Sequence, residues 1–505
     1  MPFDPPPSRA GRSARADRRG LLRIVVALAA GALGCIGATA IAYRDVLLHS
    51  QAGFWMAALY AAACSFWLMQ LARLAGGTAS VAGFLWIRFA AFFLVPAVYI
   101  GVAGPLHSRI EREVLALGLV TSGVFHLAFG LGLLPMGRRR RHEDLSELGD
   151  EQGRETHLMR MAGVAAVATV AVAGLEMWLA PGFFYNAAIT DRMGITRPST
   201  ALASLFALLD RALPAVVLTV AIIQLQRRDR RLRDYLAAGA LVLSLSPYLL
   251  SGTRAKFGAP IAIGLALLLP KLRRGEQVMA CALVVLMLST GGWFESYRYG
   301  GPQTGINAGA DVVSGASRMM QRLNLAQFDG YLARHMLTGG EPLRGESLAW
   351  LPYMFVPRGL SEKPEAAYLS SYGATLQRVF SFVVVSGGSG PVPEFVANQD
   401  VQAYGELWWN FGLGIAVMGT FLLGVLIQGW EKILVRVGGN AVWPHVVRVC
   451  FLIAFVSGTH YFQGIVTFVL RDSLVIGALC FCLERSARWR PTVARRLAPG
   501  HHACT

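Results

Sequence analysis

The chain has 505 residues, of which 54% are hydrophobic and 15% are charged, and its formal net charge is +17. The charged fraction lies well below the roughly 25% of soluble domains, which excludes a soluble fold because so much apolar surface could not be buried. The basic excess does not indicate nucleic-acid binding, since it is spread over short loops between apolar runs instead of gathering on one face.

The N-terminal residues 1–20 are rich in Pro and Arg, and the apolar run that follows is too long for the core of a signal peptide. We therefore expect a basic cytosolic tail and a retained first helix. A membrane span needs about 20 apolar residues. By this measure about twelve transmembrane helices are predicted, at 21–43, 52–74, 81–103, 113–135, 159–180, 203–225, 234–251, 256–270, 277–295, 404–430, 443–459 and 464–484.

The basic clusters predict the orientation of the spans. Lys and Arg concentrate in cytoplasmic loops, and with twelve spans all the clusters fall on one side. This arrangement predicts a multi-pass protein of the bacterial inner (cytoplasmic) membrane, N-in and C-in. The predicted parts are a basic tail (1–20), a bundle of about nine spans (21–295), a large periplasmic loop (296–403), a bundle of about three spans (404–484) and a second basic tail (485–505).

The large loop has about 100 residues and no cysteine, so it is a marginal independent domain and is expected to pack on the membrane helices. Between Asp311 and Leu337, apolar residues recur at helical spacing. This pattern predicts a pair of amphipathic helices on the membrane surface. The second half of the loop is rich in Gly and Pro and is predicted to lack regular secondary structure.

Charged side chains are costly inside a span, and those that remain usually face a bundle interior or a water-filled cavity. The predicted spans carry Arg88, Glu176, the pair Asp210 and Arg211, and the pair Arg471 and Asp472. Ion pairs between helices explain them as well as a functional site does. Arg211 and Arg471 are favoured for function because their spans run inward from the outer face. His126, alone in an apolar span, is predicted to be a satisfied helix contact.

Several basic residues lie on the predicted outer side, against the topological bias: Arg254, Lys256, Arg322, Arg358 and Lys363. They are either solvated loop charges or ligands of an anion at the membrane surface, and guanidinium groups suit the oxygens of a lipid pyrophosphate. Candidate general bases are Glu394, Asp400, Glu406 and His460. The sequence has no phosphate-binding loop and no cluster with metal-ligand spacing, so no cofactor and no metal are expected.

Three stretches in order resemble the O-antigen polymerase family, which comprises the oligosaccharide repeat-unit polymerases of the Wzy type. The first is the turn Ser251-Gly252-Thr253-Arg254. The second runs from Arg322-Leu323-Asn324 through Phe355-Val356-Pro357-Arg358 to Lys363-Pro364. The third is Gly405-Glu406-Leu407-Trp408-Trp409-Asn410-Phe411-Gly412, which enters the span after the loop.

The resemblance implies a membrane glycosyltransferase with a GT-C-like fold that acts at the periplasmic face. It would join undecaprenyl-pyrophosphate-linked oligosaccharides into O-antigen or exopolysaccharide chains. Pyrophosphate would be held by Arg254, Arg322 and Arg358 with support from Lys363, and Glu406 or Glu394 would act as the base. Lys256, Arg211 and Arg471 are further substrate-binding candidates, and His460 is a further base. The expected partners are the lipid bilayer and the chain-length regulator and flippase of the same pathway.

Two other functions fit the same layout of spans and loop. One is an O-antigen ligase-like transferase, which moves a finished glycan to another acceptor. The other is a transporter or flippase of lipid-linked oligosaccharides. The sequence favours the transporter less, because transporters tend to show paired, interrupted helices in two halves and this chain has a single large loop instead.

Overall fold

The structure is a computed structural model, and the architecture below rests on the residues that it describes. These are 9–48, 50–75, 80–103, 112–134, 154–184, 200–226, 232–251, 254–268, 272, 274–279, 282, 320, 324–340, 342–345, 348, 403–439, 441–457 and 462–488. Within these residues the secondary structure is helical and contains no strand.

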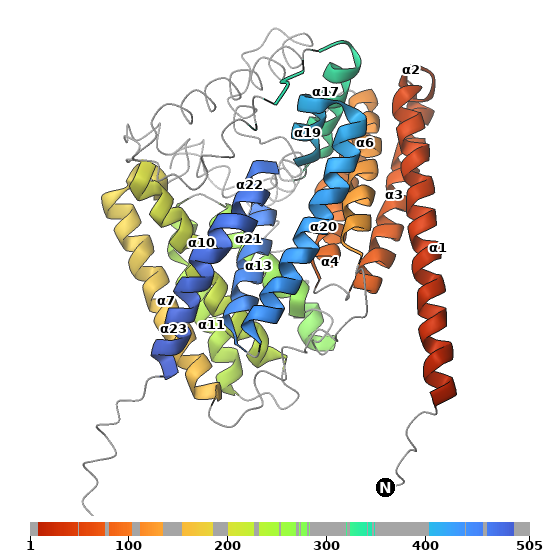
Figure 1. The fold of residues 1–505 in the computed structure, drawn as a ribbon. Helices are drawn as coiled ribbons and strands as arrows, with labels where there is room; N and C mark the ends of the chain where they lie inside the picture. Colours follow the sequence, from red (N-terminus) through yellow and green to blue (C-terminus); the bar gives the residue numbers. More distant parts are fainter. Residues whose placement is uncertain are drawn as a thin grey trace, which may run out of the picture. The chain divides into compact units, whose positions relative to one another are not determined.

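Long apolar helices dominate this part of the chain (Figure 1). Eight of the described helices are long and apolar enough to cross a membrane: Leu21–Ala42, Gln51–Ala75, Val81–Val102, Arg112–Gly132, Thr156–Leu179, Leu205–Leu225, Leu413–Gly438 and Gly464–Ser486. Shorter apolar helices cover Tyr235–Leu250, Lys256–Leu268 and Trp443–Phe455. The chain is therefore an all-α membrane protein. Most of the predicted span 277–295 lies outside the described residues, so the count of twelve spans stays a prediction.

The chain divides into two compact units. Unit 1 comprises Met1–His142, Leu265–Ile433 and Ala454–Val469, and unit 2 comprises Glu143–Gly264, Leu434–Ile453 and Leu470–Thr505. Each unit thus combines segments that lie far apart in the sequence.

Helix α6 (Arg112–Gly132) forms the core of unit 1, and nearly all of its residues are buried. It packs against α1 (Arg9–Ala42), α3 (Gln51–Ala75), α4 (Val81–Phe89) and α17 (Ala326–Leu337). A helix that is apolar on every side is buried on every side, and α6 follows this rule.

Glycine pairs bring two helices into close contact with α6. A Cβ atom on Gly118 would lie 1.8 Å from the Ala326 carbonyl oxygen, and one on Gly330 would lie 1.9 Å from the Val114 carbonyl oxygen. Near the other end of α6, Gly132 meets Gly424 of α20 (Leu413–Gly438) in the same way. Small residues let the backbones of membrane helices approach, so these glycines set the two crossings.

The third span contains a π-helix, η1 (Ala90–Leu94), between α4 and α5 (Val95–Ala103). The wider turn leaves carbonyl groups outside the regular helical pattern. One of them, the Phe92 oxygen, accepts the Leu325 N–H at 2.8 Å, directly before α17. The π-helix therefore fixes the start of the only long helix described within residues 296–403.

Helix α17 covers the second part of the predicted pair of amphipathic helices, and it packs on the long helix α6, as expected for the loop. Its apolar residues Phe328 and Leu332 form a buried cluster with Val114 of α6 and Trp409. The apolar side of α17 thus packs on protein, because its glycine crossing with α6 brings the two helices together.

The predicted span 404–430 is two helices in the structure, α19 (Ala403–Phe411) and α20. They are separated by Gly412, whose φ of +85° lies in the left-handed region. Residues other than glycine rarely adopt this conformation, so Gly412 marks the break. The apolar helix that is long enough to span a membrane therefore begins at Leu413.

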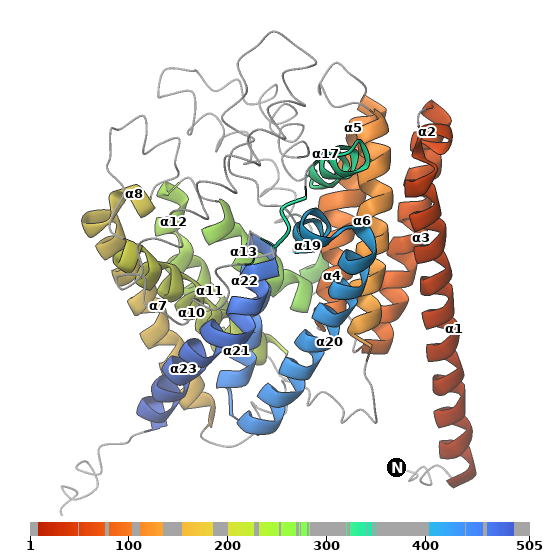
Figure 2. The ribbon, with the colours of Figure 1, turned by 45° about the horizontal axis from the view of Figure 1, so that its top comes forward.

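In unit 2, α10 (Thr200–Leu225) packs against α7 (Arg154–Leu179), α11 (Leu232–Leu245) and α23 (Ser473–Arg488). The short helices α8 (Pro181–Phe184) and α12 (Pro247–Leu250) also contact α7 and lie at one end of these helices (Figure 2). Helix α13 (Arg254–Leu268) begins close behind α12 in the sequence.

Helix α21 (Trp443–Ser457) starts in unit 2 and ends in unit 1. At its start, the N–H groups of Val442 and Trp443 donate to Glu484 Oε2 at 3.0 and 3.3 Å. Free N–H groups at a helix start need acceptors, and this buried carboxylate provides one.

Candidate functional site

A buried polar cluster lies in unit 1 where α17 meets the long helices. We call it the Asp329 cluster, and its side chains come from α4, α6, α17 and α19: Arg88, Ser122, His126, Asp329 and Tyr404. None of them is more than 5% exposed. Such burial of polar groups is costly unless they satisfy one another, so their mutual contacts define the site.

Asp329 is at the centre of these contacts. Its Oδ2 accepts hydrogen bonds from Ser122 Oγ at 2.5 Å and from the Tyr404 hydroxyl. Burial raises the pKa of Asp329 to about 7, although both hydrogen bonds and the nearby Arg88 charge act in the opposite direction. A carboxyl group with such a pKa can take up or release a proton near neutral pH.

Arg88 lies between aromatic rings instead of facing water. Its guanidinium carbon is 4.8 Å from the centroid of the Phe455 ring and 5.7 Å from that of Phe93. Cation–π attraction of this kind is strengthened where water is excluded. Arg88 therefore supplies a positive charge beside the Asp329 carboxyl group.

Among the described residues, one ring nitrogen of His126 has a hydrogen-bond partner and the other has none. Its Nδ1 lies 2.7 Å from the Ser122 carbonyl oxygen, which can only accept, so Nδ1 carries the proton. The buried Nε2 has no hydrogen-bond partner among the described residues. The expectation that His126 is a fully satisfied helix contact is therefore wrong within this part of the chain, and Nε2 is left as a proton acceptor.

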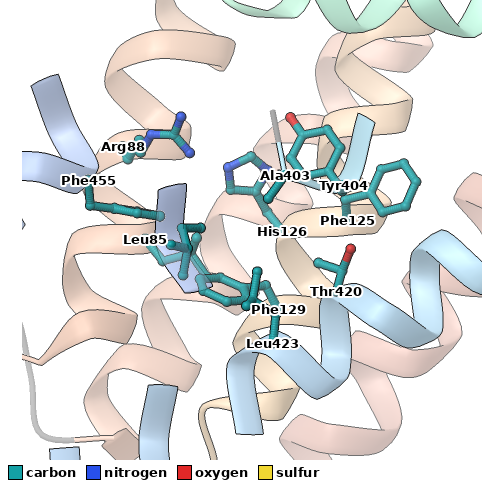
Figure 3. Close-up of a pocket in the computed structure, with 11 residues that line it drawn as sticks. Leu85, Arg88, Phe125, His126, Phe129, Ala403, Tyr404, Thr420, Leu423 and Phe455 are labelled. Carbon is teal, nitrogen blue, oxygen red and sulfur yellow. The ribbon is translucent and has the colours of Figure 1, made fainter. Parts of the chain in front are cut away.

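The cluster borders a small pocket (Figure 3). It is lined by Leu85, Arg88, Phe125, His126, Phe129, Ala403, Tyr404, Thr420, Leu423, Phe455 and Ile465. The cavity volume of about 20 Å³ is enough for one water molecule. In this conformation the pocket can therefore hold one water molecule, which can carry a proton, and it is too small for a sugar.

A second buried cluster lies in unit 2 and joins four helices. We call it the Lys256 cluster, with members Glu176 on α7, Asp210 on α10, Tyr248 on α12 and Lys256 on α13. Lys256 Nζ donates to Glu176 Oε1 and lies 2.9 Å from Asp210 Oδ2. The Tyr248 hydroxyl donates to Asp210 Oδ1 at 2.5 Å. The ammonium group also lies over the rings of Phe184 and Tyr248.

Three predicted substrate-binding residues whose side chains are described lie in unit 2. Lys256 has two acidic partners, so its charge is already compensated inside the protein. Arg211 is half-buried on α10. Arg471 is on the π-helix η8 (Phe468–Asp472), and its Nε donates to Asp472 Oδ1 at 2.8 Å.

The predicted base Glu406 is fully buried on α19 in unit 1. Its Oε2 accepts the N–H of Phe462 at 3.0 Å, at the first residue of α22 (Phe462–Thr467). Four residues on, Asn410 Oδ1 accepts the Gly345 N–H at 2.8 Å. The motif from Gly405 to Gly412 thus holds backbone segments together, which is a structural role for its polar side chains.

The other predicted site residues lie outside the described part of the chain. These are Glu394, His460, Arg322, Arg358 and Lys363, and Asp400 lies there as well. Arg254 is the first residue of α13, and its side chain is not among those described. The predicted contacts of these residues with a pyrophosphate stay predictions.

Sequence reasoning missed most of the Asp329 cluster. Arg88 and His126 were visible as polar residues in apolar spans, which is the signal that could have paired them. Asp329, Ser122 and Tyr404 gave no such signal, because an acidic residue in an amphipathic helix and a hydroxyl in an apolar span are both ordinary.

Fold and site together define an all-α membrane protein with two buried ionisable clusters. Among the described residues, no group of three or more His, Cys, Asp or Glu side chains is placed to hold a metal ion. No family model, no curated protein and no solved structure matches the chain.

Proposed function

We propose that this protein is a membrane glycosyltransferase that polymerises undecaprenyl-pyrophosphate-linked oligosaccharide repeat units at the periplasmic face of the inner membrane. The observation that carries the proposal is the Asp329 cluster. It joins a helix of the large loop, α17, to the long apolar helices through a carboxyl group that titrates near neutral pH. The three stretches that resemble O-antigen polymerases flank or contain this loop.

The reaction balances without a cofactor. The oxygen of an acceptor sugar hydroxyl forms a bond to the anomeric carbon of the donor glycan, and the bond from that carbon to pyrophosphate breaks. The pyrophosphate leaves with the electron pair, and the hydroxyl proton passes to a base. The protein must orient two lipid-linked sugars, stabilise the leaving charge and accept one proton.

We add Asp329 to the candidates for that base. Glu406 accepts a backbone N–H, whereas Asp329 has a pKa near the pH at which the reaction must run. Since the pocket admits only about one water molecule, the proton would reach Asp329 through that water and the Tyr404 hydroxyl, which donates to Asp329. Arg254, Arg322, Arg358 and Lys363 remain the proposed ligands of pyrophosphate.

The test is the length of surface glycan in a deletion strain complemented with variants. Deletion should leave single repeat units without long chains, and the natural gene should restore the long chains. Asp329→Asn should reduce long chains by roughly 100-fold or more, which is typical for loss of a general base. Asp45→Asn, a change at a carboxyl group that is 80% exposed, is the matched control and should restore full length.

Immunoblots of the membrane fraction must show equal amounts of each variant. Long surface glycan chains in the deletion strain would refute the proposal. Long glycan that accumulates on the lipid carrier would point to a ligase, and repeat units trapped on the cytosolic side would point to a flippase. Full activity of Asp329→Asn together with loss of activity in Glu406→Gln would return the role of base to Glu406.

A further inference from the structure

The charges of the Lys256 cluster do not balance. Two carboxylates, Glu176 and Asp210, face one ammonium group, so the fully ionised cluster would carry one net negative charge. The side chains of Glu176, Asp210 and Lys256 are 0%, 6% and 17% exposed. An uncompensated charge at such a place is costly, and two neighbouring carboxyl groups in one site avoid it when one of them holds a proton.

Two oxygen atoms of the cluster can take up that proton, Glu176 Oε2 and Asp210 Oδ2. Both are buried and have no hydrogen-bond partner among the described residues, although Asp210 Oδ2 also lies 2.9 Å from Lys256 Nζ. Both carboxyl groups contact the same ammonium group, Lys256 Nζ, so they lie close to each other. Two carboxyl groups so placed at a buried site favour the state in which one of them carries a proton.

We propose that the Lys256 cluster is a proton-binding site, whose ligand is one exchangeable proton shared by the carboxyl groups of Glu176 and Asp210. On binding, the proton forms an O–H bond with one carboxylate oxygen, and the net charge of the cluster rises from −1 to zero. No electrons are transferred, and water supplies the proton. The partly exposed Lys256 side chain marks the point where water can approach the site.

The position of the site gives the proton a structural effect. The four members lie on α7, α10, α12 and α13, so the site joins four helices of unit 2. Loss of the proton would place two negative charges beside each other between these helices. The spacing of the four helices therefore depends on pH, independently of any glycan chemistry.

Other titratable groups lie on the helices around the site. Helix α7 packs against α8, α10, α11, α12 and α23. Besides the cluster itself, the titratable side chains described on α7 and on these helices are His157, Arg160, Arg211, Tyr235, Cys480, Cys482, Glu484 and Arg485. Glu484 accepts the N–H groups at the start of α21, and Arg160, Tyr235, Cys482 and Arg485 are exposed. His157 belongs to the first turns of α7, whereas Glu176 belongs to its last turn. Arg211, next to Asp210 in the sequence, is the one half-buried guanidinium group of this set.

Infrared difference spectroscopy on the purified full-length protein in lipid nanodiscs tests the proposal. A protonated carboxyl group has its own carbonyl stretching band, which can be followed from about pH 5 to about pH 9. All measurements use a protein that carries Asp329→Asn, here called the background protein. Asp329 is itself a buried carboxyl group with a pKa of about 7, and its band would otherwise overlap. In this background we expect one band that is lost when either Glu176→Gln or Asp210→Asn is added. Adding Asp45→Asn, an exposed control, should leave the band unchanged.

A third variant tests whether loss of the positive charge increases the number of protonated carboxyl groups. Lys256→Met removes the ammonium group, so both carboxyl groups should be protonated and the band area should increase about twofold. If a variant fails to insert, labelling the carboxyl carbons of Asp or of Glu with ¹³C in the unaltered cluster identifies the band without mutation. Absence of the band in the background protein would overturn the proposal, as would a band that neither substitution nor labelling of these residues alters. The assay needs no glycan substrate, so its outcome is separate from that of the proposed polymerase activity.

Discussion

The Asp329 carboxyl group links the stability of unit 1 to pH. Its ordinary pKa of 3.8 rises to about 7 in the fold because it is buried. Between these two values the folded state binds more protons than the unfolded state, so the free energy of unfolding must fall as the pH rises from about 4 to about 7. Above about 7 the folded protein carries the full cost of the buried charge.

Asp329→Asn should therefore flatten this pH dependence. Thermal unfolding of the purified protein in detergent, measured between about pH 4 and about pH 8, should show a smaller loss of stability in the variant than in the natural protein. Asp45→Asn should retain the natural profile because that carboxyl group is 80% exposed. Parallel profiles of Asp329→Asn and the natural protein would show that the buried carboxyl group does not titrate in this range.

Tyr404 stabilises the ionised form of Asp329 by donating a hydrogen bond to it. Tyr404→Phe removes that donor, so the pKa of Asp329 should rise further, and the fall in stability should extend to higher pH. Tyr43→Phe, at a residue that is 63% exposed, is the matched control and should leave the profile unchanged. If the stability of Tyr404→Phe depends on pH in the same way as that of Tyr43→Phe, the hydrogen bond from Tyr404 to Asp329 is contradicted.

At the scale of elements, the crossing of α6 and α17 leaves no room for a side chain. In Gly118→Ala the new Cβ atom would lie 1.8 Å from the backbone oxygen of Ala326, so the helices must separate. We expect a loss of about 1–3 kcal/mol, as for other overpacked sites. Gly163→Ala in α7, where nothing lies within 4 Å of the Cβ position, should instead be neutral or gain about 0.5–1 kcal/mol. Denaturant unfolding curves compare the two, and equal stabilities would mean that the crossing is looser than described.

The break between α19 and α20 depends on backbone conformation alone. Gly412 has no atom within 4 Å of its Cβ position, so Gly412→Ala creates no clash, yet its φ of +85° is strained for alanine. We expect a loss of about 1–2 kcal/mol. Gly414→Ala, two residues later in α20 and equally uncrowded, should be neutral or slightly stabilising. A melting temperature that falls only in Gly412→Ala would confirm the break, whereas equal melting temperatures would contradict it.

The spans could be predicted because hydropathy is a local property. Predicted and observed helices agree closely at 21–43 and 113–135, for example, where the structure has Leu21–Ala42 and Arg112–Gly132. The break at Gly412 was harder to predict, because glycine is common in membrane helices and only its φ distinguishes this one. Likewise, the spacing of Phe328 and Leu332 predicted a helix with an apolar side, but spacing cannot tell whether lipid or protein covers that side.

The sites were less predictable than the spans, because they depend on contacts across the whole molecule. The Lys256 cluster joins residues up to 80 positions apart, and Ser122 and Asp329 are 207 positions apart. Sequence analysis identified the charged members Glu176, Asp210 and Lys256 separately and left open ion pairs between helices. It could not pair them, since no local pattern records which helix ends meet.

At the scale of the whole molecule, the π-helix η1 makes the fold depend on the exact number of residues in the third span as much as on their apolar character. Each residue of a helix advances the chain by about 100° and 1.5 Å. Deleting one residue from Ala90–Leu94 would therefore turn Arg88, before it, by about a quarter of a circle relative to α5, after it. It would also remove the wide turn that leaves the Phe92 carbonyl free to receive Leu325. This span can thus accept substitutions of apolar residues during evolution, but an insertion or deletion inside it would break the contact between Phe92 and Leu325 and separate Arg88 from its neighbours.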